Sequence, residues 1–182
     1  MPSGLKWATT NIGAENPWDL GYYFSWGNII GHNLGGPATG EYSFDATNYA
    51  STPGYQLSAD ISQGSVTYDA ASYNIGSPWR MPTKEEFQEL YDYADIEWVS
   101  DYHGVAGRKF MNKNYHNKFI FLPLTGYYDG SSSLGYQGSY GLYWSSSYNS
   151  STNAYDMYFN SSSVNPQWGN KRYDGLQIRP VK

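Results

Sequence analysis

The sequence predicts one α+β domain, and three observations lead to this fold class. The chain has 182 residues, a length at which a single domain is the usual organisation. Residues 83–94 carry a strong helical pattern, whereas several short aromatic-rich segments have the composition of strands. Gly and Pro punctuate the remainder without an internal repeat or a linker, so we expect a single domain over residues 1–182.

The main predicted helix begins at Thr83. Thr83 is a good N-cap, and Glu86 lies three residues on, where its side chain completes a capping box. Apolar residues then follow at the i, i+3, i+4 and i+7 spacing of one helix face, namely Phe87, Leu90, Tyr91 and Ala94. Acidic residues occupy the opposite face, which we interpret as solvent-exposed.

The other predicted elements are short. Asn16 is placed to cap a turn that opens with Pro17, and Asp69 is placed to cap residues 70–73. Eight segments have the composition of strands: residues 5–10, 22–26, 96–102, 108–112, 118–122, 142–147, 154–160 and 176–181. From the 30s to residue 67 the chain is rich in Gly, Pro and Asn, and we expect it to be mostly loop.

The composition argues against several functional classes. A net charge of −5 with no run of Lys or Arg provides no electrostatic footprint for nucleic acid. The longest apolar stretch, residues 119–122, is far shorter than the ~20 residues of a membrane helix, so we expect no direct membrane insertion. The absence of cysteine excludes a disulfide framework, a thiol nucleophile and a Cys-ligated metal. Residues 1–7 lack the pattern of a signal peptide, which fits an intracellular protein or an excised or mature domain.

No motif predicts catalysis. His32, His103 and His116 lack the spacing of metal ligands, so we interpret them as surface residues. No Gly-x-Ser-x-Gly motif occurs, and the Gly35-Gly36 pair lacks the flanking strand and helix of a phosphate-binding loop. A glycosidase with two catalytic carboxylates stays open as an alternative, because the sequence does not reveal the required separation of ~5–9 Å. We otherwise expect a non-enzymatic protein without a metal or cofactor.

The C-terminal quarter has a composition of its own. Residues 136–182 contain nine Ser, five Asn and seven Tyr, but only two acidic residues, Asp156 and Asp174. Tyr offers a large, rigid contact area and Ser and Asn offer adaptable hydrogen bonds, as in antibody paratopes. A polar outer sheet that keeps an edge soluble explains the same composition, so both interpretations stay open.

The pattern within this quarter predicts which side chains face solvent. In the strand 154–160, we expect Tyr155, Met157 and Phe159 to face the core and Ala154, Asp156, Tyr158 and Asn160 to face outward. We expect residues 165–170 to form a loop that exposes Trp168. In the last strand, Leu176 and Ile178 are expected inside and Gln177 and Arg179 outside.

The aromatic residues, 19% of the chain, divide into two predicted groups. The settings of core residues are found at Trp7, Trp26, Phe87, Phe119, Phe121 and Trp144. The residues that lie among Ser and Asn, and that we expect to form a contact surface, are Tyr148, Tyr158, Trp168 and Tyr173.

Sequence blocks that span nearly the whole chain resemble a known family. The blocks are SGLKWAT (3–9), NIGA (11–14), GYYFSWG (21–27), WRMPTKEEF (79–87), FLP (121–123) with GY (126–127), YWSS (143–146) and RPV (179–181). Together they resemble the Fibrobacter-type major paralogous domain, common in gut Bacteroidetes and related to the formylglycine-generating-enzyme branch of the C-type lectin fold. The resemblance implies a compact C-type-lectin-like α+β domain.

The C-terminal segment, about residues 143–179, resembles the variable region of diversity-generating-retroelement variable proteins, some of which share this fold. In those proteins adenine-rich codons are randomised to produce many binding specificities. The resemblance implies a solvent-facing, ligand-contacting set, which comprises Tyr148, Asn149, Ser150, Asp156, Tyr158, Asn160, Asn165, Gln167, Trp168, Asn170, Tyr173, Asp174 and Gln177.

Two departures from related families narrow the expectation. Many paralogues have Cys where this chain has Thr10, and the active-site cysteines of formylglycine-generating enzymes are absent, so that activity is not expected. The nearest match to the calcium-binding motif of C-type lectins is Asn165-Pro166-Gln167, which has no carboxylate. Calcium favours charged oxygen ligands, so calcium-mediated sugar binding is not expected.

These observations predict a recognition or adhesion module on a cell or virion surface, of a bacterium or a phage. Its C-terminal face is expected to bind a protein or glycan ligand. The alternative is a passive structural domain of the same family, associated with a surface layer or pilus. A hydrolase is the third hypothesis.

Overall fold

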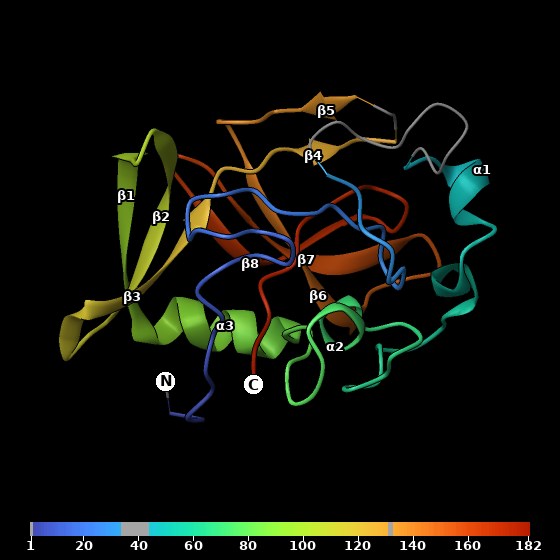
Figure 1. Ribbon diagram of the computed structural model, residues 1–182, viewed down its shortest axis with the longest axis horizontal. Helices are drawn as coiled ribbons and strands as arrows, with labels where there is room; N and C mark the ends of the chain where they lie inside the picture. Colours follow the sequence, from blue (N-terminus) through green and yellow to red (C-terminus); the bar gives the residue numbers. More distant parts are fainter. Residues whose placement is uncertain (1, 34–43, 131–132) are drawn as a thin grey trace.

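The computed structural model describes residues 2–33, 44–130 and 133–182, and in this part the domain is mixed α+β (Figure 1). The helices are α1 (Ala46–Tyr49), the 3₁₀ helix η1 (Pro53–Gln56), α2 (Ala70–Asn74) and α3 (Lys84–Tyr93). The strands are β1 (Ala94–Tyr102), β2 (Val105–Asn112), β3 (Tyr115–Pro123), β4 (Tyr127–Tyr128), β5 (Leu134–Gly135), β6 (Gly141–Tyr148), β7 (Asn153–Phe159) and β8 (Val164–Lys171). They form the antiparallel sheets β1-β2-β3, β4-β5 and β6-β7-β8. The predicted α+β class is confirmed, and none of the described helices is long and apolar enough to cross a membrane.

The capping box predicted for α3 is present. Thr83 Oγ1 accepts a hydrogen bond from the Glu86 backbone N–H at 3.2 Å, and the Glu86 carboxylate accepts one from the Thr83 N–H at 2.8 Å. Phe87 and Leu90 are buried as expected, whereas Tyr91 is exposed. The helix therefore buries a narrower stripe than its sequence pattern predicts.

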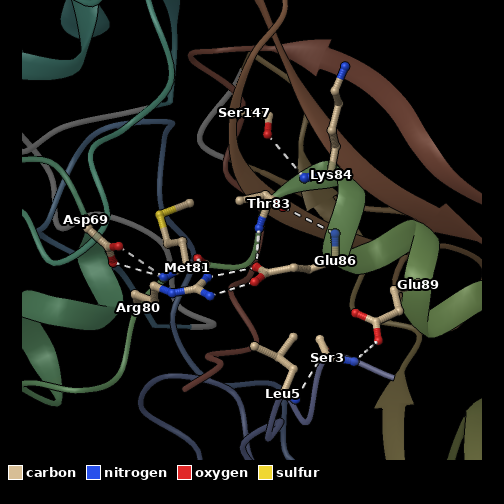
Figure 2. A network of polar contacts seen from close by, with 10 residues as sticks. All are labelled: Ser3, Leu5, Asp69, Arg80, Met81, Thr83, Lys84, Glu86, Glu89 and Ser147. Carbon is tan, nitrogen blue, oxygen red and sulfur yellow. Dashed lines mark hydrogen bonds and ion pairs between the residues drawn. The ribbon is translucent and has the colours of Figure 1, made fainter. Parts of the chain in front are cut away.

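The start of α3 also joins three parts of the fold, as Figure 2 shows. The Glu86 carboxylate that closes the capping box also pairs with the Arg80 guanidinium at 2.7 Å. The residue after Arg80, Met81, donates its backbone N–H to Asp69, the predicted N-cap of α2. The backbone N–H of Lys84 donates to Ser147 on β6 at 3.1 Å. These hydrogen bonds fix α2, α3 and β6 relative to one another.

The β6-β7-β8 sheet is covered on both faces. One core cluster joins α3 and β2 to one side of this sheet, and it includes Phe87, Leu90, Phe110, Tyr143, Met157 and Phe159. A second cluster packs segments near the two chain ends against the other side of the sheet, and we call these segments the second layer. The cluster includes Phe24, Trp26, Leu142, Trp144, Ala154, Leu176 and Ile178. The outward face predicted for residues 154–160 is therefore wrong at Ala154 and Asp156, which are buried under this second layer.

Two predictions about the C-terminal quarter are wrong. Residues 165–170, expected as a loop, belong to β8 and pair with β7. Gln177 and Arg179, expected to face outward, are buried together with Leu176 and Ile178. Their side chains are polar but face neighbouring segments that supply hydrogen-bond partners, so the alternation of the sequence does not indicate exposure here.

The two ends of the chain are less regular than predicted. Residues 5–10, 22–26 and 176–181 form isolated bridges, such as Trp7–Val181 and Phe24–Leu176, in place of continuous strands. Asn16 lies in a turn, since its backbone N–H donates to the Asp19 carboxylate at 2.8 Å.

Phe119, expected in the core, is 36% exposed on the edge strand β3. Within the long predicted loop, α1 and η1 were not anticipated, and its residues 34–43, with the Gly35-Gly36 pair, lie outside the described residues.

The capping box leads to a stability prediction. Thr83→Ala removes the hydroxyl that accepts from Glu86, and we expect the free energy of unfolding to fall by about 1 kcal/mol. Equilibrium urea unfolding measures the change, with Thr67→Ala at an exposed threonine as the matched control. Equal midpoints for the two variants would contradict a contribution from the cap.

Candidate functional site

Five aromatic rings form a continuous row beside the β6-β7-β8 sheet. The centroid distances are 5.5 Å for Tyr127–Tyr136, 5.0 Å for Tyr136–Tyr140, 5.4 Å for Tyr140–Tyr158 and 5.5 Å for Tyr158–Trp168. The first two pairs are stacked and the last two are tilted. Tyr136 is 50% exposed and Trp168 is 47% exposed, while the other three rings are half-buried. We call these five residues the aromatic row.

A bulge positions the Trp168 end of the row. Asp156 of β7 pairs with Trp168 of β8. Tyr158 lies two residues after Asp156 on β7, but it pairs with Asn165, which lies three residues before Trp168 on β8. The extra residue on β8 is a β-bulge, and such bulges redirect side chains. Asp156 and Tyr158 share one face of β7, so their partners Trp168 and Asn165 both lie on that side of the sheet. Both residues are therefore next to Tyr158.

The other end of the row is held by the connection between β5 and β6. Tyr136 has a positive φ of 59°, and its carbonyl accepts hydrogen bonds from the backbone of Ser139 and Tyr140. This turn places the rings of Tyr136 and Tyr140 side by side. Tyr127 stacks on Tyr136 from β4, which pairs with β5.

Polar side chains near Tyr158 are partly engaged in holding the site. Asn160 donates from Nδ2 to the Tyr158 hydroxyl at 2.7 Å, and its Oδ1 accepts from the backbone N–H groups of Ser162 and Ser163. Asn165 Oδ1 likewise accepts from the Gln167 N–H at 3.0 Å. These bonds restrict the conformations of the Asn160 and Asn165 side chains, whereas Gln167 stays exposed.

The acidic residues of this region have perturbed pKa values. Burial, and then the charge of Asp129, raise the pKa of Asp174 to about 7. Burial raises the pKa of Asp156 well above its usual range, although the hydrogen bond from Asn170 opposes the shift. Burial and the nearby Asp129 and Asp174 also raise the pKa of the Tyr127 hydroxyl. At neutral pH these shifts keep the Tyr127 hydroxyl protonated and favour the neutral form of the Asp156 carboxyl.

The ten solvent-accessible members of the predicted ligand-contacting set lie at two ends of the sheet. At the Trp168 end of β7-β8 the structure brings together Tyr158, Asn160, Asn165, Gln167 and Trp168. Around the turn between β6 and β7 and the end of β8 lie Tyr148, Asn149, Ser150, Asn170 and Tyr173. The predicted set is therefore not one continuous patch of contacts.

Three members of that set are not solvent-facing, and the prediction of exposure is corrected for them. Asp156 lies opposite Trp144 and Trp168 and accepts from Asn170 at 3.2 Å. Asp174 accepts from the Gly130 N–H at 3.1 Å. Gln177 accepts a hydrogen bond from the side chain of Asn11. Asp156 is buried because the second layer covers its face of the β6-β7-β8 sheet, whereas Asp174 and Gln177 are buried within the segment that follows β8.

Three of the five rings in the aromatic row lie outside the ligand-contacting set that was predicted from the sequence. Tyr127, Tyr136 and Tyr140 precede the segment 143–179 that the resemblance indicated. A signal was present, since Tyr136 and Tyr140 lie in a stretch of Gly and Ser similar in composition to the tail.

The described residues contain no group of three or more His, Cys, Asp or Glu side chains arranged to hold a metal ion. His103 stacks on Trp18 with centroids 3.8 Å apart, and His116 pairs with Asp95 at 2.7 Å. Both are exposed, as predicted for surface histidines, whereas His32 is partly buried.

A family model described as a domain of unknown function (DUF8237) matches residues 99–181. This segment runs from β1 to the buried C-terminal segment and contains all five residues of the aromatic row. No curated protein matches the chain, and no solved structure matches it.

The raised pKa of Asp174 predicts how stability changes with pH. Its folded pKa of about 7 exceeds the ordinary 3.8, so the folded state holds this proton more tightly. The stabilisation is complete below about pH 4 and is lost as the pH rises to 7, on the order of 4 kcal/mol in total. Asp174→Asn stays neutral, and we expect its stability advantage over the wild type to grow across this range in urea unfolding.

Asp129→Asn is the matched control for this effect. It removes the charge that raises the pKa of Asp174, so the loss of stability should occur over a narrower pH range. A constant stability difference between Asp174→Asn and wild type from pH 4 to 8 would contradict the assignment.

Proposed function

We propose that this domain is a non-enzymatic recognition module that binds a protein or glycan ligand through the aromatic row and the polar side chains beside it. The observation that carries the proposal is the row itself, with Tyr136 and Trp168 each about half exposed. Exposed aromatic side chains, above all Trp and Tyr, contribute most of the binding energy in many interfaces.

The packing of the row favours binding. Each ring contacts its neighbour, and Tyr158 is additionally fixed by Asn160. A side chain that is already restricted loses little conformational entropy when a ligand binds. Tyr also presents a rigid apolar ring together with a hydroxyl, which suits both sugar rings and protein surfaces.

The chemistry around Trp168 favours a ligand recognised by hydrogen bonds rather than by charge. The polar side chains beside Tyr158 and Trp168 are Asn160 and Asn165, which are neutral donors and acceptors. Asp156 lies nearby, but it is buried and its pKa is raised. Buried Asp156 and Asp174 accept hydrogen bonds from Asn170 and Gly130, which supports a structural role for both over a catalytic one.

We further infer a C-type-lectin-like fold, kinship with the Fibrobacter-type major paralogous domain, and display on a bacterial cell surface or a virion. The blocks of sequence similarity along the chain support the kinship, and the Tyr-, Ser- and Asn-rich tail supports a variable-region role for residues 143–179. One observation favours the alternative of a passive surface-layer or pilus domain. The turn Ser161–Ser163 is exposed, and the hydroxyls of Ser162 and Ser163 donate to Asn160 Oδ1, as expected of a simply solvated edge.

A glycan array and a pull-down from cell-surface extracts test the proposed function. We expect Tyr158→Ala combined with Trp168→Ala to abolish the binding detected with the wild-type domain, since each aromatic anchor contributes about 2 kcal/mol or more. Circular dichroism monitors the fold of the variant, because Tyr158 also packs against the core.

The matched control is Tyr115→Ala combined with Phe119→Ala, two exposed aromatic residues on the edge strand β3. This variant should bind as the wild type does. Binding that survives in the Tyr158/Trp168 variant overturns the site, and the absence of any ligand in both assays favours the passive structural role.

A further inference from the structure

Arg172 is a buried cation that has no carboxylate partner among the described residues. It follows β8 directly, is 1% exposed, and its guanidinium carbon lies 4.7 Å from the ring centroid of Trp26. The rings of Tyr49 and Tyr148 lie at 5.7 and 5.6 Å. A buried charge is costly unless it is paired, and cation–π contacts offset only part of that cost.

The hydrogen bonds of Arg172 leave part of its guanidinium unused. Nε donates to the Tyr49 hydroxyl at 3.0 Å, and Nη1 donates to the Ser151 carbonyl at 3.2 Å. Nη2 donates to the carbonyls of Gly54 and Tyr55. A guanidinium has five N–H groups, so one N–H on Nη1 has no acceptor in the described part of the chain.

Arg172 also lines a small pocket of about 130 Å³. The pocket is bounded by α1, by η1, by the turn between β6 and β7 and by the segment after β8, the region near the α1 label in Figure 1. Its walls are mostly aromatic or hydroxyl-bearing, and the lining residues besides Arg172 are Ala46, Tyr49, Tyr55, Ser151, Thr152 and Tyr173.

The size and lining of the pocket limit what it can hold. Pockets for drug-sized ligands span about 300–1,000 Å³, so this one admits a single functional group and not a whole ligand. A carboxylate pairs with a guanidinium through strong, charge-assisted hydrogen bonds. The rings of Tyr55 and Tyr173 offer apolar faces to an adjoining sugar ring, and Thr152 lies exposed beside them.

We propose that this pocket binds the carboxylate of an acidic sugar, such as a uronic or sialic acid residue, with Arg172 as its counter-ion. The site is separate from the aromatic row: Arg172 lies beyond the Lys171 end of β8, and the row meets β8 only at Trp168. The proposal therefore goes beyond the proposed function and does not require the row to bind anything.

Isothermal titration with glucuronic acid and N-acetylneuraminic acid, each compared with glucose, tests the proposal. Glucuronic acid differs from glucose by the carboxylate, so we expect heat of binding with the acids and none with glucose. The affinity for the two acids should fall with added salt less steeply than the strength of a surface ion pair does, because the pair between Arg172 and the carboxylate is shielded from solvent. Equal titration curves for glucuronic acid and glucose overturn the proposal.

Two variants locate the binding. Thr152→Trp fills the mouth of the pocket without removing the Arg172 charge, and we expect at least about ten-fold weaker binding of glucuronic acid, or ~1.4 kcal/mol. Thr67→Trp places the same side chain at an exposed threonine outside the pocket and should have no effect. Arg172→Met should abolish binding, with circular dichroism to confirm that it folds. Unchanged binding in Thr152→Trp overturns the proposal even if Arg172→Met is unfolded.

Two further arms separate the alternatives. N-acetylglycine presents a carboxylate without a sugar, and affinity equal to that of glucuronic acid overturns the assignment to sugar acids. The Tyr158/Trp168 double-alanine variant should bind glucuronic acid as the wild type does. If it loses this binding as well, the acid is held at the aromatic row, and the Arg172 pocket is not the site.

Discussion

Buried polar side chains that bond to the backbone hold together a chain in which regular secondary structure is limited. Arg179 donates to the carbonyls of Ala8, Thr9 and Phe121, so one side chain ties the N-terminal segment to β3. Burial lowers the pKa of Arg179 to about 10, which still leaves it charged at neutral pH. Because isolated bridges replace full strands at the chain ends, these bonds supply partners that a sheet would otherwise provide.

Hydrogen bonds from buried side chains to backbone carbonyls also hold the second layer on the β6-β7-β8 sheet. Trp144 on β6 donates its indole N–H to the Phe24 carbonyl at 2.8 Å, and Trp26 donates in return to the Ser145 carbonyl at 2.9 Å. This reciprocal pair fixes residues 24–26 across the face that carries Asp156. The middle of that face is consequently buried, and only the outer edge remains for the aromatic row.

The aromatic row and the Arg172 pocket share one structural property. Each is assembled from segments distant in sequence: the row from β4, the β5–β6 connection, β7 and β8, and the pocket from α1, η1, the β6–β7 turn and the residues after β8. The β6-β7-β8 sheet is the scaffold of both, and it is held at the start of α3 by Ser147. Strands position side chains more accurately than loops, and within the row Tyr158 and Trp168 lie on strands β7 and β8.

By itself the sequence determined the elements that depend on local interactions. The helix α3 was predicted because the Thr83–Glu86 capping box and the apolar periodicity involve residues within a few positions of one another. Only the tertiary structure decided that Asp156, Asp174 and Gln177 are buried, that residues 165–170 pair as β8, and that Tyr127, Tyr136 and Tyr140 join Tyr158. Alternation of polar and apolar residues indicates the two faces of a strand, but it does not show whether the second layer covers the polar face. The residues that cover this face of β6 and β7 lie more than a hundred positions away in the sequence.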